Sequence, residues 1–231
     1  INKLKMNKII NLKRTTFLIG TLLITTLAIA QEEHKESSHS APIPVDVLFG
    51  NNRFASQFII SKKFTDTSRF GFLASSFIAA DYENDKTQNE SMNVALINYE
   101  IVKGFGVVSG AALNSQWGFR PFSGLQYVYA NKEFMVMVLP GFYLTESHNF
   151  DSVGFVEYRP QIKNDWSLFT RLEGQYNLDM DTKKHDRSHI YGRLGVSYKT
   201  FSFGLASNYD WYGPFKEKKE NFGVFLRNAF K

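Results

Sequence analysis

The chain has 231 residues and no cysteine, which excludes a disulfide framework, thiolate metal sites, a cysteine nucleophile and a lipid-modified N-terminal cysteine. It carries 27 Lys and Arg against 22 Asp and Glu, a formal net charge of +5, and 16% of its residues are aromatic. The sequence holds no phosphate-binding glycine loop, zinc motif or nucleotide fingerprint, so it predicts no cofactor.

The first thirty residues have the features of an export signal. A basic stretch precedes an apolar run over Thr15–Ala28, which is too short to span a bilayer comfortably as a helix. Ala28-Ile29-Ala30 then supplies a small-x-small cleavage pattern, which predicts a signal peptide over residues 1–30 rather than an anchor helix. Five basic residues belong to this segment. The rest of the chain has 22 basic and 22 acidic residues, so its net charge gives no reason to expect a nucleic-acid partner.

Residues 31–44 are polar, charged and proline-bearing, and they predict a flexible periplasmic linker. His34 and His39 lie in this segment, but no third ligand stands at a recognisable metal-site spacing. We therefore expect a solvated linker and no metal site here.

From Val45 onward the hydrophobic period is two, as in strands with one apolar and one polar face. The clearest case is residues 166–178. One face carries Trp166, Leu168, Thr170, Leu172, Gly174, Tyr176 and Leu178. The other face carries Ser167, Phe169, Arg171, Glu173, Gln175 and Asn177. We expect the first face to contact lipid and the second to line an interior.

The same alternation predicts strands at 45–50, 53–64, 68–83, 91–102, 105–114, 117–130, 133–144, 150–160, 165–178, 188–198, 201–212 and 221–230. Residues 91–102 and 133–144 are apolar on both faces, and a helix is the alternative for each. β-Branched and aromatic residues favour strands there, and Pro140 and Gly141 would break a helix. No apolar stretch after residue 30 approaches the roughly 20 residues of a membrane helix, so a membrane-spanning fold requires a closed barrel.

Short and long connections largely alternate between these strands, as in a barrel with tight periplasmic turns and longer external loops. The sequence therefore predicts an all-β fold over residues 45–231. We expect a transmembrane antiparallel up-and-down β-barrel of about twelve strands, with ten as the alternative, because an even count returns the chain to the periplasm. A soluble lipocalin-like barrel also fits the alternation, but it would turn Arg171, Glu173 and Arg193 toward water.

The last strand has a pattern of its own. Apolar residues alternate from Phe222 to Phe230, and only Lys231 follows the final aromatic residue. This resembles the C-terminal strand of small Gram-negative outer-membrane β-barrels. The resemblance implies an outer-membrane location, contact with outer-membrane lipid, and recognition of this strand by the barrel-assembly machinery. It is a likeness of architecture to porin-like barrels, and no motif indicates a narrower family.

The polar face collects the side chains that we expect to line the barrel interior: Arg120, Gln126, Glu157, Arg159, Arg171, Glu173, Gln175, Arg193, Asn208, Asp210 and Arg227. They could form a salt-bridge network that fills the interior, or a charged pore lining that selects a solute. About twelve strands lie between the filled eight-stranded barrels and the 16–18-stranded porins with a water channel. We therefore predict a passive narrow channel or small-solute porin, with a non-conducting structural or surface-interaction barrel as the alternative.

A third function, an outer-membrane lipid-modifying enzyme, is less favoured. Ser147–Asn149 and Ser188–His189 supply Ser and His, but both lie where loops meet strands, and these are ordinary turn residues there. We assign no catalytic residue and expect no enzyme activity. The segment 179–187 also holds acidic residues that could bind a cation, but three basic residues among them indicate a charge-balanced, solvated loop.

One specific contact is predicted within the polar face. Arg171 and Glu173 lie two apart on one strand, and Arg193 lies on the polar face of the next. Consecutive strands are neighbours in an up-and-down barrel. We therefore expect Glu173 to lie between two guanidiniums and to be held by charge-assisted hydrogen bonds.

Overall fold

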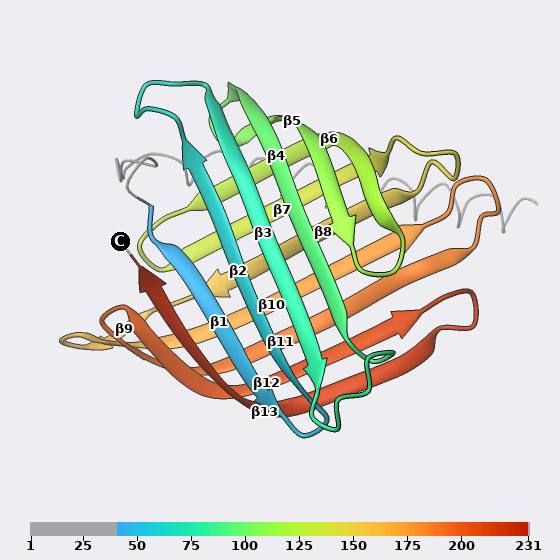
Figure 1. The fold of residues 1–231 in the computed structure, drawn as a ribbon. Coiled ribbons are helices and arrows are strands. Elements are labelled where there is room, and N and C mark those ends of the chain that lie inside the picture. The colour runs from blue at the N-terminus through green and yellow to red at the C-terminus, as the bar shows by residue number, and fades with distance from the viewer. Residues whose placement is uncertain (1–40, 231) are drawn as a thin grey trace, which may run out of the picture. The chain divides into compact units, whose positions relative to one another are not determined.

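The computed structural model describes residues 41–230, which form a barrel of antiparallel strands (Figure 1). The strands are β1 Ile43–Gly50, β2 Arg53–Lys63, β3 Phe70–Asp81, β4 Glu90–Val102, β5 Phe105–Asn114, β6 Gly118–Ala130, β7 Phe134–Tyr143, β8 Phe150–Tyr158, β9 Gln161–Lys163, β10 Trp166–Leu178, β11 His185–Tyr198, β12 Phe201–Tyr212 and β13 Glu217–Phe230. Residues 41–230 contain no helix that is long and apolar enough to cross a membrane.

The strands form one sheet that closes on itself. β1 pairs along its whole length with β13, so that Asp46 lies opposite Arg227, and β8 pairs directly with β10. The short β9 pairs only with the first residues of β10 and lies beside the barrel wall. The closed barrel therefore has twelve strands, with β9 as an addition, which confirms the predicted fold class and strand count.

The outer surface carries aromatic rings toward both ends of the strands and aliphatic side chains between them. At the end where β1 begins and β13 finishes, which we name the terminal end, rings pair across neighbouring strands: Phe70 with Tyr99, Phe134 with Tyr158, and Trp166 with Tyr198. At the opposite end, named the loop end, the pairs are Phe142 with Phe150 and Tyr209 with Phe222. Exposed aliphatic residues fill the middle: Ile97, Val138, Leu172, Leu194, Leu205 and Val224. This is the arrangement of a lipid-facing apolar band between aromatic girdles.

The two faces of β10 lie as the alternation predicts. Leu172 is 60% exposed on the outer surface, whereas Arg171 and Glu173 are 7% and 4% exposed inside the barrel. Arg193 on β11 is also inside, at 7%. A soluble barrel that turns these charges toward water is therefore wrong for this chain.

The strands that are apolar on both faces line one side of the interior. β4 and β7 are strands, as predicted, and their inward residues Leu96, Met137 and Leu139 are each less than 5% exposed. They belong to an apolar cluster with Leu73, Val108, Ala112, Phe122, Tyr143 and Phe155. A packed interior wall thus removes the inner apolar face of these strands from water.

Some strand boundaries differ from those expected. β8 ends at Tyr158, and Gln161–Lys163, expected in a turn, forms β9 instead. β4 begins at Glu90 and β11 at His185, so these strands extend further toward the loop end than the apolar pattern indicates. β1 begins at Ile43. The proposed signal peptide, residues 1–30, and most of the proposed linker, residues 31–44, lie outside the described residues.

Two facing glycines bring β11 and β12 close together. Gly195 and Gly204 are register partners, and both point inward. A Cβ atom on Gly195 would lie 2.0 Å from the carbonyl oxygen of Phe203, and one on Gly204 would lie 2.2 Å from that of Leu194. The local backbone approach therefore requires residues without side chains.

Replacing Gly204 by alanine should destabilise the barrel by about 1–3 kcal/mol, because the new methyl group must push two strands apart. The measurement is the temperature at which the folded band loses its altered mobility in a denaturing gel. Gly174→Ala is the matched control, because its Cβ would come no closer than 3.7 Å to any neighbour. Equal transition temperatures for the two variants would contradict the close approach.

Candidate functional site: the barrel interior

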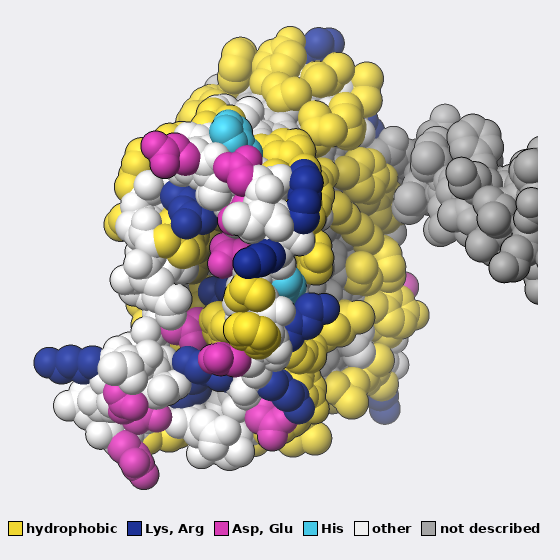
Figure 2. Space-filling view, turned by 90° about the vertical axis from the view of Figure 1, so that its right-hand side faces the viewer, with side chains coloured by type: hydrophobic (Ala, Val, Ile, Leu, Met, Phe, Trp, Pro, Cys, Tyr) yellow, Lys and Arg dark blue, Asp and Glu magenta, His cyan; other side chains and the backbone are white. Residues whose placement is uncertain are grey.

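The interior has two walls of different chemistry. Inward side chains of β10–β13, β1 and β2 include most of the buried charged and amide-bearing residues, whereas the buried apolar cluster lies mainly on β3–β7. Each strand presents alternate residues to the interior, so the residue types at those positions decide the chemistry of each wall. Figure 2 looks onto the loop end, where Lys, Arg, Asp and Glu side chains gather with intermixed signs.

Near the loop end, four charges form a ring of alternating sign, which we name the outer ring. Arg53 Nη1 lies 2.7 Å from Glu90 Oε1, and Arg53 Nη2 lies 2.9 Å from Asp210 Oδ2. Arg187 Nη2 closes the ring, 3.0 Å from Asp210 Oδ1 and 3.3 Å from Glu90 Oε2. The hydroxyls of Tyr191 and Tyr212 donate to Asp210 and Glu90, respectively. The carboxylates of Asp210 and Glu90 are 0% and 4% exposed, and the two guanidiniums compensate their buried charges.

Toward the terminal end, Glu157 is the centre of a second group, which we name the inner cluster. Its carboxylate lies 2.9 Å from Arg227 Nη2, 3.1 Å from Arg171 Nη1 and 3.8 Å from Arg159 Nε. Arg171 also donates to Glu173, which in addition accepts from Gln57 Nε2 at 2.9 Å. Five of the predicted lumen residues therefore meet in one network.

The expected bridge from Glu173 to Arg193 is wrong. Arg193 lies directly opposite Arg171 in the β10–β11 register, so two like charges face each other there. Arg193 instead binds Asp46 Oδ1 at 3.1 Å through Nη2, and its Nη1 donates to Asn208 Oδ1 at 2.8 Å. Like-charge repulsion across the ladder explains why the two guanidiniums take different carboxylates.

The remaining predicted residues also point inward but join neither charged group. Gln175 donates to Asp151 Oδ1 at 2.8 Å. The guanidinium of Arg120 lies over the Trp117 ring, 4.4 Å from its centroid, in a cation–π contact near the loop end. Gln126 is 6% exposed, and its Oε1 has no hydrogen-bond partner in the described part of the chain.

Several interior residues were missed by the sequence interpretation. Glu90 and Arg187 lie just outside the strands predicted at 91–102 and 188–198, where the apolar alternation has already stopped. Asp46 and Arg53 were detectable in principle, because each occupies an inward position of the period-two pattern. Asp151 belongs to the same class, since it alternates with Phe150 and Ser152 on β8.

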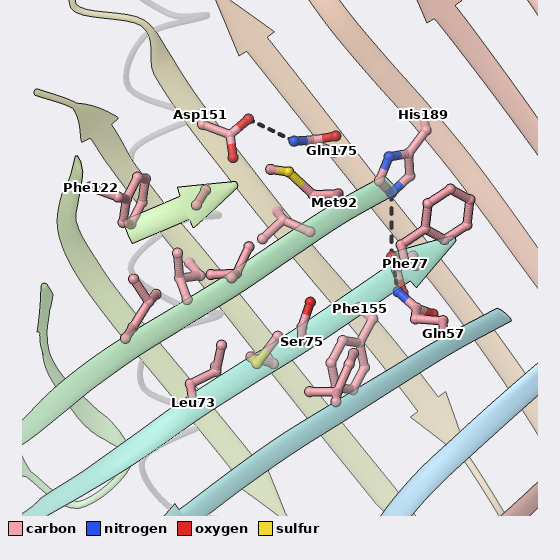
Figure 3. A pocket seen from close by; sticks show the side chains of 18 of the residues that line it. Gln57, Leu73, Ser75, Phe77, Met92, Phe122, Asp151, Phe155, Gln175 and His189 are labelled. Carbon is pink, nitrogen blue, oxygen red and sulfur yellow. Dashed lines mark hydrogen bonds and ion pairs between the residues drawn. The ribbon is translucent and has the colours of Figure 1, made fainter. Parts of the chain in front are cut away.

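A cavity of about 100 Å³ lies between the polar and apolar walls (Figure 3). Its polar side carries Gln57, Asp151, Glu173, Gln175 and His189, and its apolar side includes Leu73, Met92, Leu96, Phe122, Met137 and Phe155. A water molecule needs roughly 10–15 Å³ of such space, so the cavity has room for several waters or one small solute.

Of the Ser and His candidates, Ser188 contacts the ring of His185 rather than that of its sequence neighbour His189. Ser188 Oγ lies 2.9 Å from His185 Nε2, and the Nδ1 of His185 lies 2.7 Å from the carbonyl oxygen of Gly213. The acceptor at Nδ1 is a backbone carbonyl rather than the carboxylate of a hydrolase triad. The contact ties the beginning of β11 to the loop 213–216.

The acidic residues of the loop 179–184 are used within the loops. Asp179 Oδ1 accepts from the backbone amides of Asp181 and Thr182, and these hydrogen bonds, led by that from Thr182, hold the pKa of Asp179 below its ordinary value. Asp181 faces His148 in the neighbouring loop at 3.7 Å. Residues 41–230 contain no group of three His, Asp or Glu side chains that could hold a metal ion.

No protein-family model matches this chain, and no curated protein matches it in sequence. Among solved structures it is similar to the KdgM porin, with 16% identity over 82% of this chain and 99% of that chain, and a TM-score of 0.44. It is similar to the NanC porin, with 13% identity over 83% of this chain and 100% of that chain, and a TM-score of 0.47. It is also similar to OmpT of Vibrio cholerae, with 11% identity over 78% and 65% of the two chains, and a TM-score of 0.38. These neighbours are outer-membrane proteins, and the comparison identifies no narrower family.

Proposed function

We propose that this chain is an outer-membrane β-barrel that conducts small polar solutes passively through a narrow, hydrated lumen. The observation that carries this proposal is a series of buried polar atoms with no hydrogen-bond partner in the described protein. They include Asn98 Oδ1, Gln126 Oε1 and Arg227 Nη1 toward the terminal end, and His189 Nδ1, Arg187 Nε and Arg120 Nη1 toward the loop end. Buried polar groups in native proteins almost always have a partner, and water or a polar solute beside these atoms would supply one.

The paired charges fit a narrow passage. Outer-ring and inner-cluster side chains cross the interior from one wall to another, which limits the free width. Because acidic and basic groups alternate within each group, a solute that passes meets both signs at close range. We therefore expect small neutral or zwitterionic solutes to pass more readily than large ones.

A non-conducting barrel is the second candidate, and a specific contact favours it. Arg187 on β11 and Glu90 on β4 form an ion pair although five strands separate them in either direction around the barrel. A pair that joins opposite walls could plug the lumen. Liposomes that contain the folded protein distinguish the candidates. A narrow channel predicts swelling in glycine or arabinose and none in a trisaccharide, whereas a plugged barrel predicts no swelling in any of them.

Export by a cleaved signal peptide is part of the same proposal. It is supported by the basic stretch, the short apolar run and the Ala28-Ile29-Ala30 pattern. N-terminal sequencing of the envelope protein should therefore begin at Gln31. We also propose that the protein has no hydrolase activity, which incubation with labelled phospholipid tests.

A further inference from the structure

We propose that the interior cavity is a binding site for small alkylamines, with the ammonium group on Asp151 and the alkyl group against the apolar wall. This inference rests on the proposed function for the route by which the amine enters, and it names a class of solute for the lumen. It is drawn from the one buried carboxylate of the cavity that lacks a basic partner, together with the chemistry of the opposite wall.

Asp151 differs from the other buried carboxylates of the interior. It is 4% exposed, and no Lys, Arg or His of the described residues lies within ion-pair distance of it. Its two hydrogen bonds come from the amides of Gln175, at 2.8 Å, and Asn177, at 3.0 Å, and both end on Oδ1. Its second oxygen, Oδ2, receives no hydrogen bond from the described protein. A buried carboxylate without a cation is costly, so this position favours a positively charged guest.

A second polar side chain, His189, lines the same cavity. His189 is 8% exposed, and neither of its ring nitrogens has a hydrogen-bond partner in the described residues. Its Nε2 faces Glu173 at 3.4 Å, which favours the tautomer with the proton on Nε2 and leaves Nδ1 as an acceptor. Gln175 links the two residues, because it is the register partner of His189 and donates to Asp151 (Figure 3).

The guanidinium and the second carboxylate that line the cavity are both paired with other residues. Arg187 lines the cavity, but its guanidinium is held by Glu90 and Asp210 of the outer ring. Glu173 is likewise held by Arg171 and Gln57. Asp151 is therefore the cavity carboxylate that forms no ion pair with any of residues 41–230.

The apolar wall and the volume limit the rest of the guest. Apolar side chains of β3, β4, β6 and β7, including Leu73, Leu96, Phe122 and Met137, also line the cavity. An apolar cavity of about 150 Å³ binds benzene, so the smaller space here, about 100 Å³, suits a branched alkyl group of a few carbons. A hydrated inorganic cation would leave this wall without an apolar partner.

The test is a ligand-observed NMR titration of the folded, full-length barrel in detergent, with empty micelles as the blank. The probes are isobutylamine, isobutanol and isobutyrate, which share the hydrocarbon group and differ in charge. The wild-type protein should bind the amine about tenfold more tightly than the alcohol, or better, because a charge-assisted hydrogen bond is added, and should not bind the carboxylate. Equal affinity for amine and alcohol would overturn the proposal without any variant.

Asp151→Asn removes the charge and keeps an oxygen that can accept from Gln175 and Asn177. The amine should then bind no more tightly than the alcohol. Glu146→Gln is the matched control, because it removes one negative charge from an exposed residue of the adjoining loop 144–149 and should retain the amine preference. An unchanged amine preference in a folded Asp151→Asn barrel would contradict the assignment of Asp151.

Binding and conduction can fail separately. Isobutylamine should reduce glycine uptake in liposomes with the wild-type protein and have no effect with Asp151→Asn. Uptake without an amine preference in the titration would leave the channel and refute the amine site. An amine preference without any uptake would leave the site and refute the channel.

Discussion

Replacing Glu157 by glutamine should lower barrel stability by about 3–5 kcal/mol, which is the cost of breaking a buried ion pair by removing one partner. Glu157 is 1% exposed and lies within 4 Å of the guanidiniums of Arg159, Arg171 and Arg227. A neutral amide would leave the buried guanidiniums of Arg171 and Arg227 facing each other, with the half-buried Arg159 beside them. The expected result is a large fall in the temperature at which the heat-dependent gel shift occurs.

Glu220→Gln is the matched control for this prediction. Glu220 pairs with Lys218 at 2.7 Å, but both side chains are nearly half exposed on the surface. Solvent screens such a pair, so its loss should leave the transition temperature unchanged. Equal transitions for Glu157→Gln and the control would show that the inner cluster carries no stabilising charge balance.

Replacing Leu172 by arginine should cost about 2–4 kcal/mol, because the residue lies midway along β10 on the lipid-facing surface, where charge is least tolerated. Leu172 is 60% exposed in the isolated barrel, so the cost arises from lipid rather than from lost core packing. Folding yield into lipid vesicles, together with the urea midpoint of the folded fraction, measures it.

Tyr176→Arg provides the depth control on the same strand and face. Tyr176 lies toward the loop end, four residues from Leu172, and near the interface an arginine costs only about 0–1 kcal/mol. If Leu172→Arg folded as well as Tyr176→Arg, the lipid-facing assignment of this surface would be wrong.

The sequence predicts which face of a strand a residue occupies far better than which partner it binds. Leu172 and Arg171 were assigned to opposite faces because the side-chain period of a strand is two, and neighbour interactions do not alter it. The partner of Arg193 was predicted from adjacent strands, yet its carboxylate, Asp46, comes from β1. Contacts across an interior depend on strand stagger and on the cross-section of the barrel, and neither is encoded in local alternation.

Residues at strand ends show a second limit. Glu90 and Arg187 complete the outer ring, but both lie at the start of their strands, after a polar loop and without an apolar neighbour to extend the alternation. Their inward orientation results from ladder pairing with the neighbouring strands, which continues to these positions. Arg187, for instance, pairs with Asn177 on β10 and Tyr212 on β12. A sequence pattern that depends on apolar residues ends before such pairing does.

Single-channel recording in planar lipid bilayers tests the proposed narrow lumen most directly. Purified protein that shows the heat-dependent gel shift should insert and give discrete, small conductance steps. Under a salt gradient, the reversal potential of Glu157→Gln channels should shift toward anion selectivity, because the variant removes a negative charge from the interior. A folded, inserted barrel that gave no conductance steps would contradict the account and would leave the protein as a plugged structural barrel.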